Sequence, residues 1–136
     1  MRNVTLVDSG PLIALFDRSD RYHDRVLEFL KGFDGKLLSS WPVLTEVSHM
    51  LSFNLRVQLD FLEWISRGAV EVASIEQREI TSILAYMRRY LDVPMDLADA
   101  SLIHLAEREG IETILSIDRD YYIYRTEGRR MLQKLL

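Results

Sequence analysis

The chain of 136 residues has no cysteine, only 3 prolines and 6 glycines, and no apolar run long enough to cross a membrane. Without cysteine, the sequence excludes disulfides, thiolate metal sites and a cysteine nucleophile. A spanning helix needs about 20 consecutive apolar residues, and the N-terminus also lacks the pattern of a signal peptide. We therefore expect a soluble, cytoplasmic protein with no membrane partner.

Lysine is scarce as well, with 3 lysines against 14 arginines and a formal net charge of −4. This net charge argues against wholesale coating of nucleic acid. It remains compatible with a nucleic-acid enzyme, because an acidic metal pocket lowers the net charge by itself. Arginine is the better bidentate phosphate ligand, so four arginines near the C-terminus are candidates for phosphate contacts or, alternatively, a solvated basic patch: Arg119, Arg125, Arg129 and Arg130.

What is present is the composition of a globular protein, with 48% apolar and 28% charged residues. The length suits one domain with a sizeable core. Because the sequence contains no linker, repeat or low-complexity segment, it predicts a single domain over residues 1–136.

Short apolar segments recur along the chain, separated by helical patterns of about ten residues or more, and we expect strands at 3–7, 36–39, 70–73 and 113–117. Strands that alternate with helices indicate βα units. The sequence therefore predicts an α/β fold of three layers, α/β/α, with a central, mainly parallel sheet of four or five strands. In the tail we expect an edge strand at 122–124 and a last helical turn.

Acidic residues stand where such a fold places ligands. Asp8 follows the first strand and Asp118 the last long one, and parallel strands end at the same edge of a sheet. Asp96 and Asp99 belong to the first turn of a helix, where the helix dipole favours negative charge. Glu46 lies at the border of an apolar helix face. Converging carboxylates repel one another, and Mg²⁺ or Mn²⁺ with oxygen ligands is the usual compensation.

Each acid also has a plainer interpretation. Asp96 suits a helix N-cap, Asp8 and Asp118 suit turns after strands, and Glu46 suits a solvated helix edge. Asp99 is harder to explain, because it falls on the same helix face as apolar side chains. Ser9 and Ser116 fit either as turn caps or as hydrogen-bond donors to a ligand carboxylate or a phosphate. The three histidines have no metal-site spacing.

The order of the acids, each in its local context, resembles that of the PIN domain family. Four segments carry the resemblance: Val7-Asp8-Ser9, Leu44-Thr45-Glu46-Val47, the stretch from Asp96 through Asp99 to Ala100, and the stretch from Leu115 through Asp118 to Tyr121. It covers nearly the whole chain, and the length is similar to that of the small prokaryotic VapC-type toxins.

The resemblance implies a PIN-like α/β/α fold and a metal-dependent endoribonuclease, the toxin of a type II toxin–antitoxin pair. By position, it assigns catalysis and binding of Mg²⁺ or Mn²⁺ to Asp8, Glu46, Asp99 and Asp118, with Asp96 as a possible further ligand. Glu46 would act as a direct or water-mediated ligand, or would orient the attacking water. The implied partners are RNA, a small antitoxin and a second copy in a homodimer.

Other classes remain open. An orphan nuclease without antitoxin would carry the same acids, and so would a non-catalytic module with an acidic pocket. A phosphoacceptor receiver would require a lysine after a late strand, yet the lysines are at positions 31, 36 and 134. A haloacid-dehalogenase-type phosphatase would require an aspartate at position 10, where Gly10 stands. The expected third and fourth helices are rich in apolar side chains, among them Phe53, Phe61 and Trp64. These side chains are candidates either for a surface that binds a partner or a second copy, or for ordinary core.

Overall fold

A computed structural model describes residues 3–93, 95–118, 124–126, 128 and 130–136. Its elements follow one another in the order β1 (Val4–Val7), α1 (Ser9–Phe16), α2 (His23–Lys31), β2 (Lys36–Ser40), α3 (Trp41–Met50), α4 (Leu55–Ser66), β3 (Glu71–Ala73), the 3-10 helix η1 (Gln77–Glu79), α5 (Ile80–Arg89), α6 (Leu97–Glu109), β4 (Thr113–Leu115) and β5 (Gln133–Leu135). In this part of the chain no helix is both long and apolar enough to span a bilayer.

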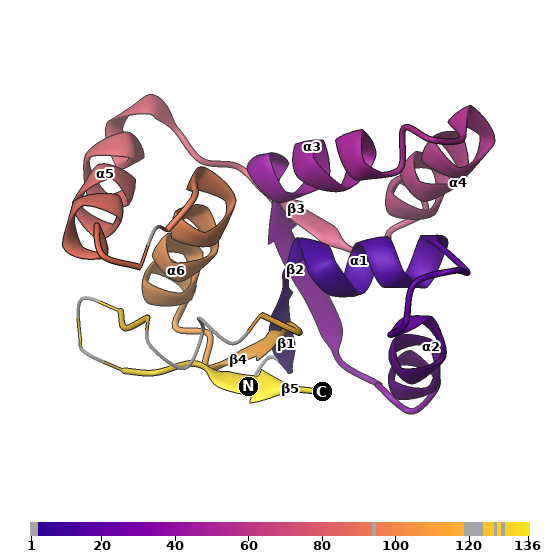
Figure 1. The fold of residues 1–136 in the computed structure, drawn as a ribbon. Coiled ribbons are helices and arrows are strands. Elements are labelled where there is room, and N and C mark those ends of the chain that lie inside the picture. The colour runs from indigo at the N-terminus through magenta and orange to yellow at the C-terminus, as the bar shows by residue number, and fades with distance from the viewer. Residues whose placement is uncertain (1–2, 94, 119–123, 127, 129) are drawn as a thin grey trace.

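The strands form one five-stranded sheet in the order β3-β2-β1-β4-β5, and each pair of neighbouring strands is parallel. Leu6 of β1 pairs with Leu38 of β2 on one side and with Ile114 of β4 on the other. Figure 1 shows α5 and α6 on one side of this sheet and α1 and α2 on the other. The predicted α/β/α architecture with a parallel sheet is thereby confirmed.

The central strands are buried on both faces, which explains their continuous apolar runs. Leu6 and Val7 of β1, like Ile114 and Leu115 of β4, are inaccessible to solvent. Helix α6 is buried along most of its length, because β2 and α3 pack against it and α5 covers it as well. The buried surface of this helix is therefore wider than the apolar stripe that its sequence predicts.

The helix that carries the late acids starts and stops as its sequence predicts. Asp96 is the N-cap of α6, and its Oδ1 accepts a hydrogen bond of 2.8 Å from the backbone N–H of Leu97. Gly110 ends the helix with φ = 67°, a left-handed conformation that glycine adopts without strain. The turn then leads directly into β4.

The tail differs from the sequence expectation. Of the expected edge strand at 122–124, residues 122 and 123 lie outside the described residues, and Tyr124 is not in a strand. The expected last helical turn is wrong, because Gln133–Leu135 forms β5. Pairing with β4 satisfies backbone groups that a single turn of helix would leave open, and Gln133 N–H also donates to Glu112 O at 2.8 Å.

A half-buried carboxylate connects η1 to α6. Oε1 of Glu79 lies 2.8 Å from Nε2 of His104 and 2.7 Å from Nη1 of Arg108, and its Oε2 accepts from the backbone N–H of Glu76 at 2.7 Å. The hydrogen bond from Glu76, followed by those from His104 and Arg108, lowers the pKa of Glu79 to about 2. The carboxylate is therefore ionised at neutral pH.

We expect Glu79→Gln to lower the free energy of unfolding at pH 7 by roughly 1–3 kcal/mol, because two charge-assisted hydrogen bonds are weakened. The folded-state pKa is depressed from 4.5 to about 2, so this stabilisation is present above pH 4.5 and is lost as the pH falls toward 2. Urea unfolding of both proteins between pH 7 and pH 2 measures the difference.

The control is Glu63→Gln, which removes an exposed ion pair of 2.9 Å with Arg67 and should change stability little. A difference between Glu79→Gln and the unsubstituted protein that stayed constant down to pH 2 would contradict the assigned role.

Candidate metal centre

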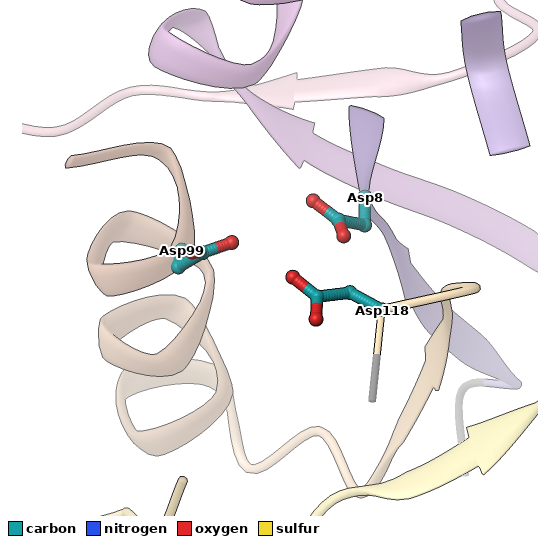
Figure 2. Close-up of side chains that lie close together, drawn as sticks. All are labelled: Asp8, Asp99 and Asp118. Carbon is teal, nitrogen blue, oxygen red and sulfur yellow. The ribbon is translucent and has the colours of Figure 1, made fainter. Parts of the chain in front are cut away.

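Three aspartates converge at the carboxyl end of the sheet. Asp8 directly follows β1, Asp99 lies in the first turn of α6, and Asp118 follows β4. One oxygen from each lies within 4.8 Å of the corresponding oxygens of the other two. Figure 2 shows the three carboxylates pointing toward a common space from three separate elements. The sequence prediction placed these three residues together, and the structure brings them together.

Asp8 is the most enclosed member, with 4% of its surface exposed. Its backbone N–H donates to Leu115 O at 3.0 Å, which continues the pairing of β1 with β4. Its Oδ1 accepts from the backbone N–H of Ser9 at 2.8 Å, so the side chain also caps α1. Its Oδ2 accepts from Oγ of Ser116 at 3.1 Å. Asp8 is thereby fixed from both neighbouring elements.

Ser116 links two of the aspartates. While its hydroxyl donates to Asp8, its Oγ accepts from the backbone N–H of Asp118 at 2.9 Å. The side chain is fully buried, so this geometry is shielded from competing water. Ser116 therefore fills both of its expected roles, because it caps the turn to Asp118 and its hydroxyl binds the carboxylate of Asp8.

Glu46 is not one of the residues whose carboxylate oxygens lie within 4.8 Å of one another, and it is connected to them through Ser9. It is half-buried on α3, and its Oε1 accepts a hydrogen bond of 2.8 Å from Oγ of Ser9. Because Ser9 directly follows Asp8, this bond ties the fourth predicted acid to the cluster. Asp96, by contrast, is exposed and caps α6, as its plainer interpretation predicts.

The cluster concentrates negative charge, which a bound cation would offset. Burial, followed by the charges of Asp99 and Asp118, raises the pKa of Asp8 to about 7 against the opposing hydrogen bonds from Ser9 and Ser116. An ionised Asp8 is therefore costly in the metal-free protein. Hard divalent cations take carboxylate oxygens as ligands, so the donor set of Asp8, Asp99 and Asp118 fits such an ion.

The remaining candidates lie elsewhere. His23 Nδ1 is 2.7 Å from Ala14 O, and His104 binds Glu79, so both histidines have partners away from the cluster. Arg125 Nη1 donates to Tyr124 O at 3.0 Å, and Arg130 Nη1 pairs with Glu112 at 3.4 Å. The other two arginines proposed for phosphate contacts, at positions 119 and 129, lie outside the described residues.

Sequence reasoning did not identify the close approach of Gly10 to Ile117 beside the cluster. In the sequence Gly10 lies between Ser9 and Pro11, where a turn that opens a helix accounts for a glycine by itself.

This chain is similar in sequence to one VapC protein and in fold to another. Ribonuclease VapC26 of Mycobacterium tuberculosis (strain ATCC 25618 / H37Rv) is 29% identical over 119 residues, which cover 86% of this chain and 88% of that protein. The crystal structure of Mycobacterium tuberculosis VapC20, a Sarcin-Ricin loop cleaving toxin, superimposes with a TM-score of 0.80 at 17% identity, covering 88% and 93% of the two chains.

Two complexes share the fold. A toxin–antitoxin complex from Klebsiella pneumoniae matches with a TM-score of 0.66 at 19% identity, covering 86% of this chain and 89% of that one. VapBC2 from Rickettsia felis, bound to a DNA fragment from its promoter, matches with a TM-score of 0.64 at 13% identity over 97% of each chain.

The PIN domain family model matches residues 5–128, a span that contains all four predicted acids. The resemblance inferred from the sequence is confirmed: this chain belongs to the PIN domain family.

Proposed function

We propose that this protein is a metal-dependent endoribonuclease and the toxin of a type II toxin–antitoxin pair. The observation that carries the proposal is the meeting of Asp8, Asp99 and Asp118 within 4.8 Å in a chain of the PIN domain family. The similarity to a protein named Ribonuclease VapC26 supports RNA as the substrate. The complexes among the structural neighbours support a small antitoxin as the partner.

In the proposed reaction, Asp8, Asp99 and Asp118 would hold Mg²⁺ or Mn²⁺, which would supply Lewis-acid chemistry, lowering the pKa of water and offsetting charge on the phosphate. Ser116 keeps Asp8 and Asp118 in register through its two hydrogen bonds. The hydroxyl of Ser9 donates a hydrogen bond to Oε1 of Glu46. To Oε2 of Glu46 we assign the role of orienting the attacking water.

The partner surface that we propose lies on α3 and α4. Large apolar side chains of these helices and the turn between them are exposed: Trp41, Met50, Phe53, Leu55, Leu59 and Leu62. Phe61 and Trp64 are not available there, because both rings pack edge-on against Phe16, at centroid distances of 5.4 Å and 5.3 Å. A small antitoxin that lays an apolar helix on this surface would gain most of its affinity from it. The homodimer stays a prediction.

The first test of catalysis is Asp99→Asn, which keeps the shape of the side chain and removes one charge from the cluster. We expect metal-dependent RNA cleavage to fall by at least on the order of a hundredfold, because loss of a ligand should exceed the effect of losing an outer-shell partner. Cleavage of total RNA with and without Mn²⁺ is the measurement, and thermal melting shows that the variant is folded.

Asp60→Asn on the exposed face of α4 is the matched control and should retain full activity. A well-folded Asp99→Asn protein that cleaved RNA at the original rate would refute the assignment.

The raised pKa of Asp8 predicts an unusual dependence of stability on pH. Because the folded-state pKa of about 7 lies above the ordinary aspartate value of 3.8, the metal-free protein should lose stability as the pH rises from about 4 to about 7. Asp8→Asn, which removes this ionisation, should therefore melt at a higher temperature than the unsubstituted protein at pH 8, with the advantage fading near pH 4.

Millimolar Mn²⁺ should reverse the order at pH 8, because a ligand that binds only the folded state raises its stability by mass action. An unsubstituted protein whose melting temperature does not respond to Mn²⁺ would contradict the metal site.

Inhibition by the partner can be tested through metal affinity. We expect the antitoxin to insert an arginine or lysine among the acids of the cluster, and a cation there competes with metal. Two ligands that oppose each other do so reciprocally, so the complex should bind Mn²⁺ more weakly than the free protein. Calorimetric titration of Mn²⁺ into the free protein and into its complex with the product of the adjacent gene measures this.

Equal Mn²⁺ affinity in both would exclude insertion into the cluster. Failure of the neighbouring product to bind would favour the orphan nuclease without antitoxin.

A further inference from the structure

Gly10 is the second residue of α1, and two features of its surroundings favour a residue without a Cβ. A positive φ is not one of them, because within the described ranges positive φ angles among glycines occur at Gly68 and Gly110 only. The first feature is Pro11, because a residue that carries a Cβ is disfavoured in the helical region directly before a proline. The second feature is the space beside position 10, and it is the one that bears on the acidic cluster.

The space beside Gly10 is filled by Ile117. A Cβ atom built on Gly10 would lie 2.7 Å from Cγ1 of Ile117 and 3.1 Å from its Cδ1. Carbon atoms in contact prefer about 3.5–4.0 Å, so a methyl group at position 10 forces a shift. Ile117 directly precedes Asp118, which is one of the three clustered acids.

The segment around Ile117 has little freedom to withdraw. On one side of it, the hydroxyl of Ser116 donates to Asp8 at 3.1 Å. On the other, the backbone N–H of Asp118 donates to that same hydroxyl at 2.9 Å. A shift of the Ile117 side chain that carries its backbone along therefore acts on the two hydrogen bonds that keep Asp8 and Asp118 together.

We propose that Gly10 is a positioning residue for the metal centre: its missing side chain lets the segment 116–118 settle against the first turn of α1 and so sets the separation of Asp8 and Asp118. The proposal rests on the proposed function only in using metal affinity as a readout. Gly10 itself provides no ligand atom.

The test is a comparison of Gly10→Ala, Ile117→Ala and the double variant. Gly10→Ala should lower the affinity for Mn²⁺ on the order of tenfold, the range found when groups that orient metal ligands are lost. Its metal-free melting temperature should fall modestly, because Pro11 opposes a helical residue with a Cβ at position 10, whereas alanine otherwise favours the helix. In the double variant Cγ1 and Cδ1 are gone, so its Mn²⁺ affinity should return to that of Ile117→Ala alone.

Gly32→Ala is the matched control, because Gly32 also has negative φ (−98°) and its nearest neighbour to an added Cβ is Phe29 O at 4.0 Å. It should leave Mn²⁺ affinity unchanged. Calorimetry with Mn²⁺ alone gives the affinities, and melting of the metal-free proteins separates them from loss of fold.

Unchanged Mn²⁺ affinity in Gly10→Ala would overturn the proposal, and so would a loss that Ile117→Ala does not relieve. Crystal structures of the metal-free proteins give an independent readout, in which the contact between Ser116 Oγ and Asp8 Oδ2 should lengthen in Gly10→Ala. An unchanged contact would also overturn the proposal. If the unsubstituted protein bound no Mn²⁺, the proposed function would fail while this crystallographic comparison still decided the role of Gly10.

Discussion

The burial of negative charge at the carboxyl end of the sheet is the constraint on which the site depends. Asp8 is almost inaccessible to solvent and shares its surroundings with Asp99 and Asp118. Bringing these groups together opposes folding unless a cation or hydrogen bonds compensate. The surrounding residues hold the carboxylates in place, and a bound divalent ion would turn their repulsion into affinity. Stability and metal binding are therefore linked through the same three side chains.

Small hydroxyl residues supply the necessary order. Ser9 links the start of α1 to Glu46 on α3, and Ser116 links Asp8 to Asp118 across β1 and the end of β4. A buried pair of hydroxyls connects the start of α3 with α6, where Oγ of Ser40 is 2.7 Å from Oγ of Ser101. Together these hydrogen bonds connect the elements around the acidic cluster, and the approach of Ile117 to Gly10 adds a packing contact beside it.

The buried and the exposed side chains of α3 serve different purposes. Its buried side chains, Val43, Leu44 and Val47, fill the core, whereas Trp41 and Met50 are exposed. Glu46 lies between these regions, close to the acidic cluster and to the apolar surface on α3 and α4. A partner bound to that surface would therefore lie close to Glu46. This proximity gives a physical route by which binding of the partner could control catalysis.

The sequence by itself determined the parallel α/β architecture, the start of α6 at Asp96 and its end at Gly110, and the strand ends that carry Asp8 and Asp118, because strand and helix patterns and caps are local signals. Tertiary structure decided the rest. It placed Phe61 in the core, made β5 from the expected helical turn, gave Glu46 its partner Ser9, and put Ile117 against Gly10. Each of these depends on contacts between residues distant in the chain, which no local pattern encodes.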